Sequence, residues 1–185
     1  RPNRSLSSAH QIRKTKIKSM RHLLTLALSL SITFLLAQDN PNWLRHASIS
    51  PDGTEIVFTY KGDLYKVSST GGDAQQLTFH VAHDYKAIWS KDGQTIAFAS
   101  NRYGNFDIYI MNAKGGKAER LTYHSSHESP YSFSPDGSKV YFGGVRQDDA
   151  QYRQVPHRSQ SELYSVPKQG GKVSQVFTFP AESVQ

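Results

Sequence analysis

The chain of 185 residues contains no cysteine. The absence of thiols excludes a disulfide framework, a thiolate metal site and a cysteine nucleophile. It also excludes a lipoprotein, whose lipid anchor requires a cysteine after the apolar run of the leader. A Gly-x-Ser-x-Gly motif and a phosphate-cradling glycine loop are missing as well. The sequence therefore offers no catalytic residue and no cofactor site.

Acidic residues are absent from the first 38 positions. The formal net charge of +7 arises from 22 Lys and Arg against 15 Asp and Glu. Seven of the cations precede Asp39, and they are Arg1, Arg4, Arg13, Lys14, Lys16, Lys18 and Arg21. The rest of the chain is balanced in charge and has no basic patch, so we expect no nucleic-acid partner.

An uncharged apolar run covers residues 23–37, directly after Met20 and two basic residues. It is shorter than the roughly 20 apolar residues that span a bilayer. The pattern is typical of a secretory signal peptide cleaved after Ala37. Residues 1–19 are interpreted as an upstream extension of it. We expect residues 1–37 to be a leader and the protein to be secreted, with the periplasm as its compartment and no membrane contact after cleavage. The alternative is an uncleaved membrane anchor.

A repeat is the strongest feature of the remaining sequence. Five elements recur three times in one order: a Ser-x-Asp-Gly turn (50–53, 90–93, 134–137), an apolar run (56–58, 96–98, 140–142), an acid-aliphatic-Tyr triplet (63–65, 107–109, 162–164), a Gly-Gly pair (71–72, 115–116, 170–171) and an aliphatic residue (Leu77, Leu121, Val176). The turn aspartates are 40 and 44 residues apart. That period is typical of a β-propeller blade.

Each element has a local structural meaning. Asp-Gly closes a tight hairpin, the alternating run after it is a strand, and Gly-Gly marks a second hairpin. The unit is therefore four antiparallel strands, which the second repeat places at about 87–90, 95–100, 108–112 and 118–123. The fold class is all-β: a partial β-propeller with three four-stranded antiparallel blades and the start of a fourth.

The domain expectation is a leader at 1–37 followed by the N-terminal part of a propeller at 38–185. The blades cover about 43–83, 84–127 and 128–179, and a fourth begins at about 180. An insertion at about 144–161 is interpreted as a surface loop. Three blades cannot close a ring, because propellers have typically 4–8. We therefore expect a fragment of a longer protein, with a linear solenoid as the alternative architecture.

These landmarks resemble the Tol-type propeller repeats of bacterial envelope proteins. The propeller follows the leader after only five residues, and Asn105-Phe106-Asp107-Ile108-Tyr109 and Arg120-Leu121-Thr122-Tyr123-His124 are most similar to secreted tricorn-like serine peptidases of the carboxy-terminal-processing class. The resemblance implies PDZ and protease domains further along the chain. No catalytic residue of that class can be assigned to any position here.

Propeller topology places the connections between second and third strands, and those between blades, on one face. The side chains expected on that face are His80, His83, Arg102, Tyr103, His124 and His127. Imidazole, guanidinium and aromatic groups suit contacts with peptides or glycans. The alternative is a solvated loop surface. The two His-x-x-His pairs lie in loops, so no metal site is predicted from them.

Asp63, Asp107 and Glu162 occupy one position in each blade. They are therefore interpreted as structural acceptors of backbone N–H groups and not as a catalytic pair.

The expected function is to admit or steer peptide or protein substrates toward a protease core elsewhere in the same chain. Whether the parent protein is an enzyme stays open at this point. One alternative is a non-catalytic, protein-binding propeller of Tol-Pal type. Another is the propeller of a different hydrolase, either prolyl-oligopeptidase-like or an amidohydrolase.

Overall fold

The computed structural model describes residues 43–146 and 161–177. The predicted leader, most of the predicted insertion and the predicted start of a fourth blade lie outside these residues. The described residues form strands, turns and loops. None of their segments is a helix of the length and hydropathy needed to cross a bilayer.

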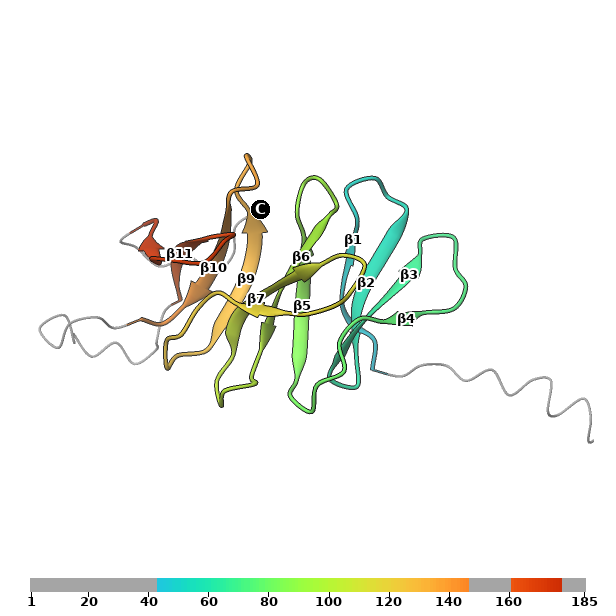
Figure 1. The fold of residues 1–185 in the computed structure, drawn as a ribbon, viewed down its shortest axis with the longest axis horizontal. Coiled ribbons are helices and arrows are strands. Elements are labelled where there is room, and N and C mark those ends of the chain that lie inside the picture. The colour runs from blue at the N-terminus through green and yellow to red at the C-terminus, as the bar shows by residue number, and fades with distance from the viewer. Residues whose placement is uncertain (1–42, 147–160, 178–185) are drawn as a thin grey trace, which may run out of the picture. The chain divides into compact units, whose positions relative to one another are not determined.

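Three separate sheets each contain four antiparallel strands in chain order (Figure 1). Blade 1 comprises β1 (Arg45–Ile49), β2 (Glu55–Tyr60), β3 (Asp63–Ser68) and β4 (Gln75–Gln76). Blade 2 comprises β5 (Asp84–Trp89), β6 (Thr95–Ser100), β7 (Asp107–Asn112) and β8 (Glu119–Arg120). Blade 3 comprises β9 (Glu128–Phe133), β10 (Lys139–Gly144), β11 (Glu162–Pro167) and β12 (Ser174–Gln175). The prediction of three four-stranded antiparallel blades is confirmed.

Two strands of blade 2 differ from their predicted bounds. The first strand, β5, begins at Asp84 rather than near residue 87, and its register shifts between Tyr85 and Ile88. Lys86 lies at the shift with a φ of 54°, the left-handed conformation that an interrupted strand adopts. The bulge adds a residue to one strand, so simple alternation of side chains did not reveal it.

The fourth strands are shorter than predicted because a threonine side chain replaces part of the ladder. In blade 2 only Glu119–Arg120 is strand, whereas residues 118–123 were expected. Two residues further on, the hydroxyl of Thr122 accepts a hydrogen bond from Ile108 N at 2.8 Å. Thr78 does the same for Leu64 N at 2.9 Å. The Leu-Thr element thus ends each of these sheets with a side-chain bond.

The Ser-x-Asp-Gly segments form the hairpin tips, as predicted. In blade 1, Ser50 Oγ donates to Asp52 Oδ1 at 2.6 Å and accepts from Glu55 N at 2.9 Å. Gly53 has a φ of 74°, which a residue with a Cβ rarely adopts. Equivalent bonds are present at Ser90 and Ser134. The turn is therefore built entirely from its own residues.

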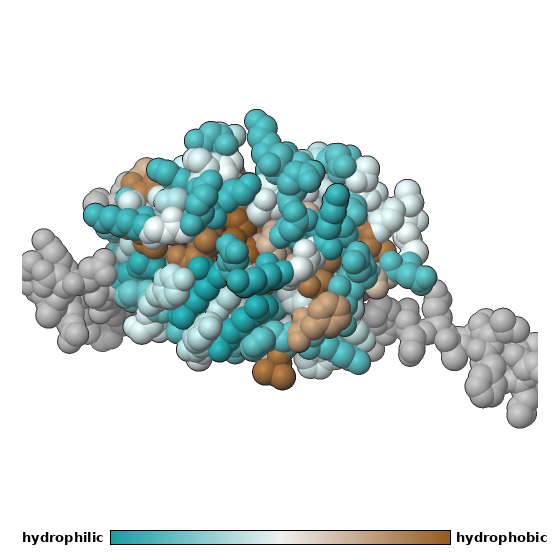
Figure 2. Space-filling view, viewed as in Figure 1, coloured by the Kyte–Doolittle hydropathy of each residue, from teal (hydrophilic) through white to brown (hydrophobic). Residues whose placement is uncertain are grey.

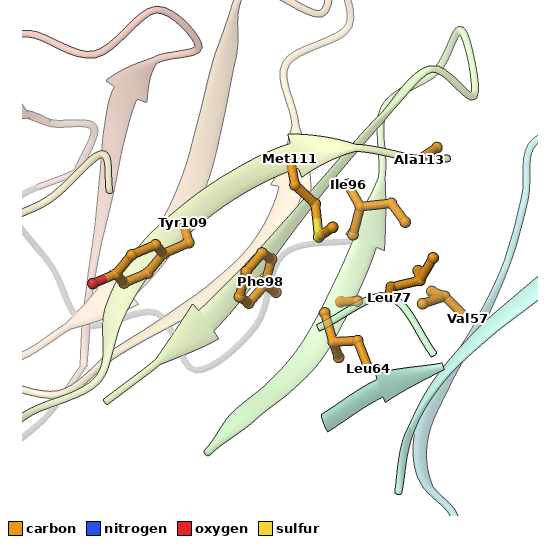
Figure 3. Packing of buried hydrophobic residues seen from close by; sticks show 9 residues of the cluster. Val57, Leu64, Leu77, Ile96, Phe98, Tyr109, Met111 and Ala113 are labelled. Atoms are coloured by element: carbon orange, nitrogen blue, oxygen red, sulfur yellow. The ribbon is translucent and has the colours of Figure 1, made fainter. Parts of the chain in front are cut away.

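Blades pack face to face through apolar side chains. Phe98, Ile96 and Met111 of blade 2 point toward Val57, Leu64 and Leu77 of blade 1 (Figure 3). The residues of the second interface, between blades 2 and 3, are Ala97, Ile108, Ile110, Leu121, Val140, Phe142, Tyr164 and Val166. All six residues of β6 are buried because this strand has a neighbouring sheet on each side. The large residues at 96 and 98 face blade 1, and the small residue at 97 faces blade 3.

The blades approach one another most closely at their first strands, β1, β5 and β9. The indole nitrogen of Trp89 in β5 donates to Ser48 O of β1 at 3.1 Å across this contact. The sheets fan outward from these strands (Figure 1). Each blade consequently has an inner strand, an outer strand and two edges that carry connections.

Candidate functional site

The two edges of the blades carry different kinds of connection. The turn edge consists of the hairpins at 50–54, 69–74, 90–94, 113–118, 134–138 and 168–173. The loop rim consists of the connections at 61–62, 77–83, 101–106 and 121–127, with Val145 and Arg146 after β10. Asp84 N donates to Gly62 O, and Glu128 N donates to Phe106 O, both at 2.7 Å. These bonds join successive blades along the loop rim.

Three of the predicted histidines are held by backbone amides. Nδ1 accepts a hydrogen bond from Ala82 N at His80, from Ser126 N at His124 and from Phe106 N at His127, at distances of 3.0, 3.1 and 3.1 Å. A neutral imidazole that accepts at Nδ1 carries its hydrogen on Nε2. Each ring therefore offers Nε2–H as a donor and not as a metal ligand. Among the described residues, no three His, Asp or Glu side chains converge on a common point.

A row of aromatic and imidazole rings runs along the inner end of the loop rim, from blade 1 across blade 2 to the connection that leads into blade 3. Ring centroids are 5.4 Å apart between His46 and Tyr85, 4.8 Å between Tyr85 and Phe106, and 5.5 Å between Phe106 and His127. His83 lies beside this row, 5.8 Å from Tyr85. We call these five residues the ring row. Tilted and edge-to-face contacts of this kind hold the rings in fixed orientations.

Lys86 adds a cation next to the ring row. Its ammonium donates to Ser129 Oγ at 2.9 Å and lies 4.7 Å from the centre of the Tyr131 ring, so it joins blade 2 to blade 3. Partial burial lowers the pKa of Lys86. Burial also lowers the pKa of His46, as do the positive charges of Lys86 and Arg45 near it. The inner end of the rim is thus cationic and partly shielded from water.

Arg102, which was predicted on this face as a ligand-contacting side chain, forms an ion pair in the structure. Its guanidinium is 17% exposed and donates at 2.9 Å to Asp84, whose side chain is fully buried. It also lies over the stacked rings of Phe98 and Tyr109. The same arrangement recurs 44 residues later, where Arg146 pairs with buried Glu128. Each of these arginines therefore neutralises a buried acid of its own blade.

The acids at the start of each third strand accept side-chain donors, which corrects the prediction of backbone donors. Asp63 accepts Gln76 Nε2 at 3.1 Å and the Thr78 hydroxyl at 3.1 Å. Asp107 accepts Arg120 at 2.7 Å, and Glu162 accepts the Tyr164 hydroxyl. Burial raises the pKa of Asp63 and of Asp107. The donors in blades 1 and 2 differ because the residue 13 positions after the acid is Gln76 in blade 1 and Arg120 in blade 2.

A pocket of about 710 Å³ opens on the loop rim of blade 1. Its lining includes Thr59, Asp63, His80, Ala82 and His83, with Trp43, Arg45, Lys61, Gly62 and Val81 around them. The volume is in the range of small-ligand sites. This pocket was not predicted from the sequence, although the connection at 61–62 is visibly shorter than its counterpart in the second repeat.

The structure places the six predicted residues on one edge but divides them by role. His83 and His127 belong to the ring row, and His80 lines the pocket. His124 binds its own loop, and Arg102 is paired with Asp84 of the same blade. Tyr103 is 68% exposed, and its ring lies 4.5 Å from the Arg120 guanidinium. Tyr85, Phe106 and Lys86 were not predicted, and Asn105-Phe106 was noted only as a family signature. Figure 2 shows one face of the molecule, where hydrophilic side chains surround scattered apolar ones.

The blades and their loop rim define the class as part of a four-stranded-blade β-propeller. A family model described as the tricorn protease N-terminal β-propeller domain matches residues 41–185. The chain belongs to this family.

Solved structures show the same fold. A tricorn protease is 22% identical with a TM-score of 0.64, and the match covers 78% of this chain but 14% of that one. A chain assigned as a dipeptidyl aminopeptidase IV from Bacteroides ovatus is 16% identical with a TM-score of 0.53, over 72% of this chain and 22% of that one. A chain assigned as TolB from Agrobacterium tumefaciens is 19% identical, covering 76% of this chain and 64% of that one, at a TM-score of 0.40. That last value is too low to carry an argument. No curated protein matches the chain.

Proposed function

We propose that this propeller binds extended peptide segments on its loop rim and steers them toward a protease core elsewhere in the same polypeptide. The ring row is the observation that carries the proposal, because it offers a continuous line of rings from blade 1 to the connection between blades 2 and 3. Aromatic faces and edges pack against peptide side chains without a strict sequence requirement. The Nε2–H groups of His80 and His127 supply donors for peptide carbonyl oxygens.

Selection of extended over folded chains follows from the geometry of the rim. A single extended strand offers carbonyl oxygens and side chains to a row of rings, whereas a folded domain has satisfied those groups internally. The proposal includes PDZ and serine protease domains in the parent protein and secretion to the periplasm. It is supported by the family match and by the leader-like sequence at 20–37.

The test compares long and short substrates in the full-length protein. In the variant Tyr85→Ala/Phe106→Ala we expect kcat/KM for a long, disordered protein substrate to fall about tenfold or more, since two anchoring rings are removed. Cleavage of a short chromogenic peptide, which reaches the core without the rim, is expected to stay unchanged.

Tyr123→Ala is the matched control. This ring is also aromatic and on the rim but is 73% exposed and lies outside the ring row. Unchanged cleavage of long substrates by the double variant would refute the steering role. A full-length protein that binds peptides on the rim but cleaves none would instead identify a non-catalytic binding propeller.

A further inference from the structure

The blade 1 pocket exists because one connection is four residues shorter than its counterpart. In blade 2, β6 ends at Ser100 and β7 begins at Asp107. In blade 1, β2 ends at Tyr60 and β3 begins at Asp63, so only Lys61 and Gly62 connect them. Their φ values of 50° and 94° are those of a tight two-residue turn. The space that four further residues would occupy is left open.

Blade 2 shows which group normally fills this space. Asn105 Nδ2 donates to His124 O at 2.7 Å, to Ser126 O at 3.1 Å and to Asp107 Oδ1 at 3.2 Å. One repeat earlier, 44 residues before, the corresponding acceptors are His80, Ala82 and Asp63. All three line the pocket.

In blade 1, Asp63 accepts Gln76 Nε2 at 3.1 Å, whereas the two loop carbonyls lack an amide donor among the described residues. Within 43–146 and 161–177, no residue donates to the carbonyl oxygens of His80 and Ala82. Lys61 holds the repeat position of Asn105, but its ammonium lies over the Tyr60 ring at 5.1 Å. The blade 1 pocket thus keeps two carbonyl acceptors of the carboxamide and has no counterpart of Asn105 to pair with them.

A second observation points to the same ligand. Thr59 lines the pocket and is 4% exposed, yet its hydroxyl has no hydrogen-bond partner in the part of the chain that the structure describes. The equivalent residue in blade 2 is Ala99, beneath the longer connection. Buried hydroxyls are normally satisfied, so an unpartnered one in the wall of a pocket points to a polar ligand atom. The Thr59 oxygen is closed to solvent in this conformation, so a ligand would reach it once the side chain turns toward the pocket.

We propose that the blade 1 pocket binds the primary carboxamide of an Asn or Gln side chain in a peptide. The amide nitrogen donates to the two loop carbonyls, and the amide oxygen accepts from the Thr59 hydroxyl. An ammonium group offers donors alone and meets the positive charges of Arg45 and Lys61 in the lining. A carboxylate offers no donor to the carbonyls. The site deepens the peptide-binding function proposed above and rests on it for its biological role.

The first experiment measures binding of three labelled peptides to the full-length protein by fluorescence anisotropy. They are acetyl-Gly-Asn-Phe-Gly methylamide and its analogues with Asp or Leu in place of Asn. The methylamide end avoids a competing primary carboxamide. We expect the Asn peptide to bind at least tenfold tighter than either analogue, because each analogue leaves polar groups of the pocket unpaired.

Two variants test whether the preference for the Asn peptide arises in the blade 1 pocket. In the first variant, the sequence of residues 101–106 replaces Lys61–Gly62. The arginine of the graft is changed to Ser, because its partner in blade 2, Asp84, has Leu44 as its counterpart in blade 1. The grafted Asn is expected to fill the pocket and abolish the preference, whereas the same graft with Leu for Asn leaves the carbonyls unpaired. In the second, Thr59→Val is expected to weaken Asn-peptide binding three- to tenfold. Thr70→Val, an exposed threonine on the turn edge, is its matched control.

Equal binding of the three peptides, or a preference that survives both the graft and Thr59→Val, would overturn the inference. The two proposals fail separately. If long disordered substrates depend on the ring row while short peptides show no Asn preference, steering stands and the carboxamide site is wrong. If the Asn preference holds while Tyr85→Ala/Phe106→Ala cleaves long substrates normally, the site stands and steering is wrong.

Discussion

The turn edge and the loop rim of the same blades treat carboxylates in opposite ways. On the turn edge, the serine hydroxyl and a backbone amide in each turn lower the pKa values of Asp52, Asp92 and Asp136. On the loop rim, burial raises the pKa values of Asp107 and Glu128 even though each pairs with an arginine. Hydration accounts for the difference, because the turn acids face water and the rim acids do not.

The two edges also differ in how closely they repeat from blade to blade. The turn edge is nearly identical in all three blades, with the same serine and aspartate bonds in each. The loop rim changes between blades, with two residues connecting β2 to β3 and six connecting β6 to β7. The edge that builds the fold is therefore constant, and the edge that carries pocket and ring row is the variable one.

The largest effect is expected from breaking a rim ion pair. Arg102→Met leaves Asp84 fully buried without its cation, and removal of one partner of a buried pair costs about 3–5 kcal/mol. The control is Lys66→Met, which breaks a partly exposed pair with Glu55 at 2.9 Å between β3 and β2. Such a pair contributes at most about 1 kcal/mol. Urea unfolding compares the two variants.

The double variant Arg102→Met/Asp84→Asn tests whether the unpaired charge of Asp84 causes the loss of stability. Without the buried charge, most of the lost stability is expected to return. Equal losses in the single and double variants would mean that the arginine stabilises by packing on Phe98 and Tyr109 rather than by charge.

A moderate effect is expected at Gly143, which holds the repeat position of Thr59 and Ala99. A Cβ added there would collide with the Tyr131 side chain and lie 2.6 Å from Ser161 Oγ. Gly143→Ala is therefore expected to destabilise the fold by about 1–3 kcal/mol. The neighbouring Gly144→Ala is the control, since its added Cβ meets Glu128 at 3.3 Å. Similar unfolding temperatures for the two variants would contradict the close approach of Tyr131.

The smallest effect, on the turn edge, depends on pH. The folded-state pKa of Asp136 is lowered to about 2, so its ionised form contributes stability above the unfolded pKa of about 4. That contribution is lost as the pH falls from about 4 to about 2. Asp136→Asn is expected to lower the unfolding temperature at pH 7, and the difference from the parent protein should vanish near pH 2. A constant difference would mean that the turn bonds do not require the charge.

Much of the fold could be predicted because its signals are local. Ser-x-Asp-Gly and Gly-Gly turns are specified by their own residues, and β6 was predicted at its observed bounds. The first strand of blade 2 was misjudged because the bulge at Lys86 depends on neighbouring strands. The fourth strand was overextended because the Thr122 hydroxyl, not a backbone carbonyl, accepts the last bond.

The candidate site was less predictable, since its contacts join residues far apart in the chain. The histidines were found by their recurrence, but their amide partners were not. The ion pairs could have been predicted from the repeat. Asp84 and Glu128 are 44 residues apart, and so are Arg102 and Arg146. The pocket follows from a length difference between two connections, which pattern matching by residue type does not detect.

The turn at Lys61–Gly62 has a consequence for how such a propeller can change. Strands β2 and β3 pair over the same six positions as β6 and β7, despite the four-residue difference between their connections. Insertion or deletion of residues in this connection therefore leaves the pairing of the two strands unchanged. The loop rim can therefore change in one blade without changes in the strands of the others, as in a scaffold designed to display variable loops.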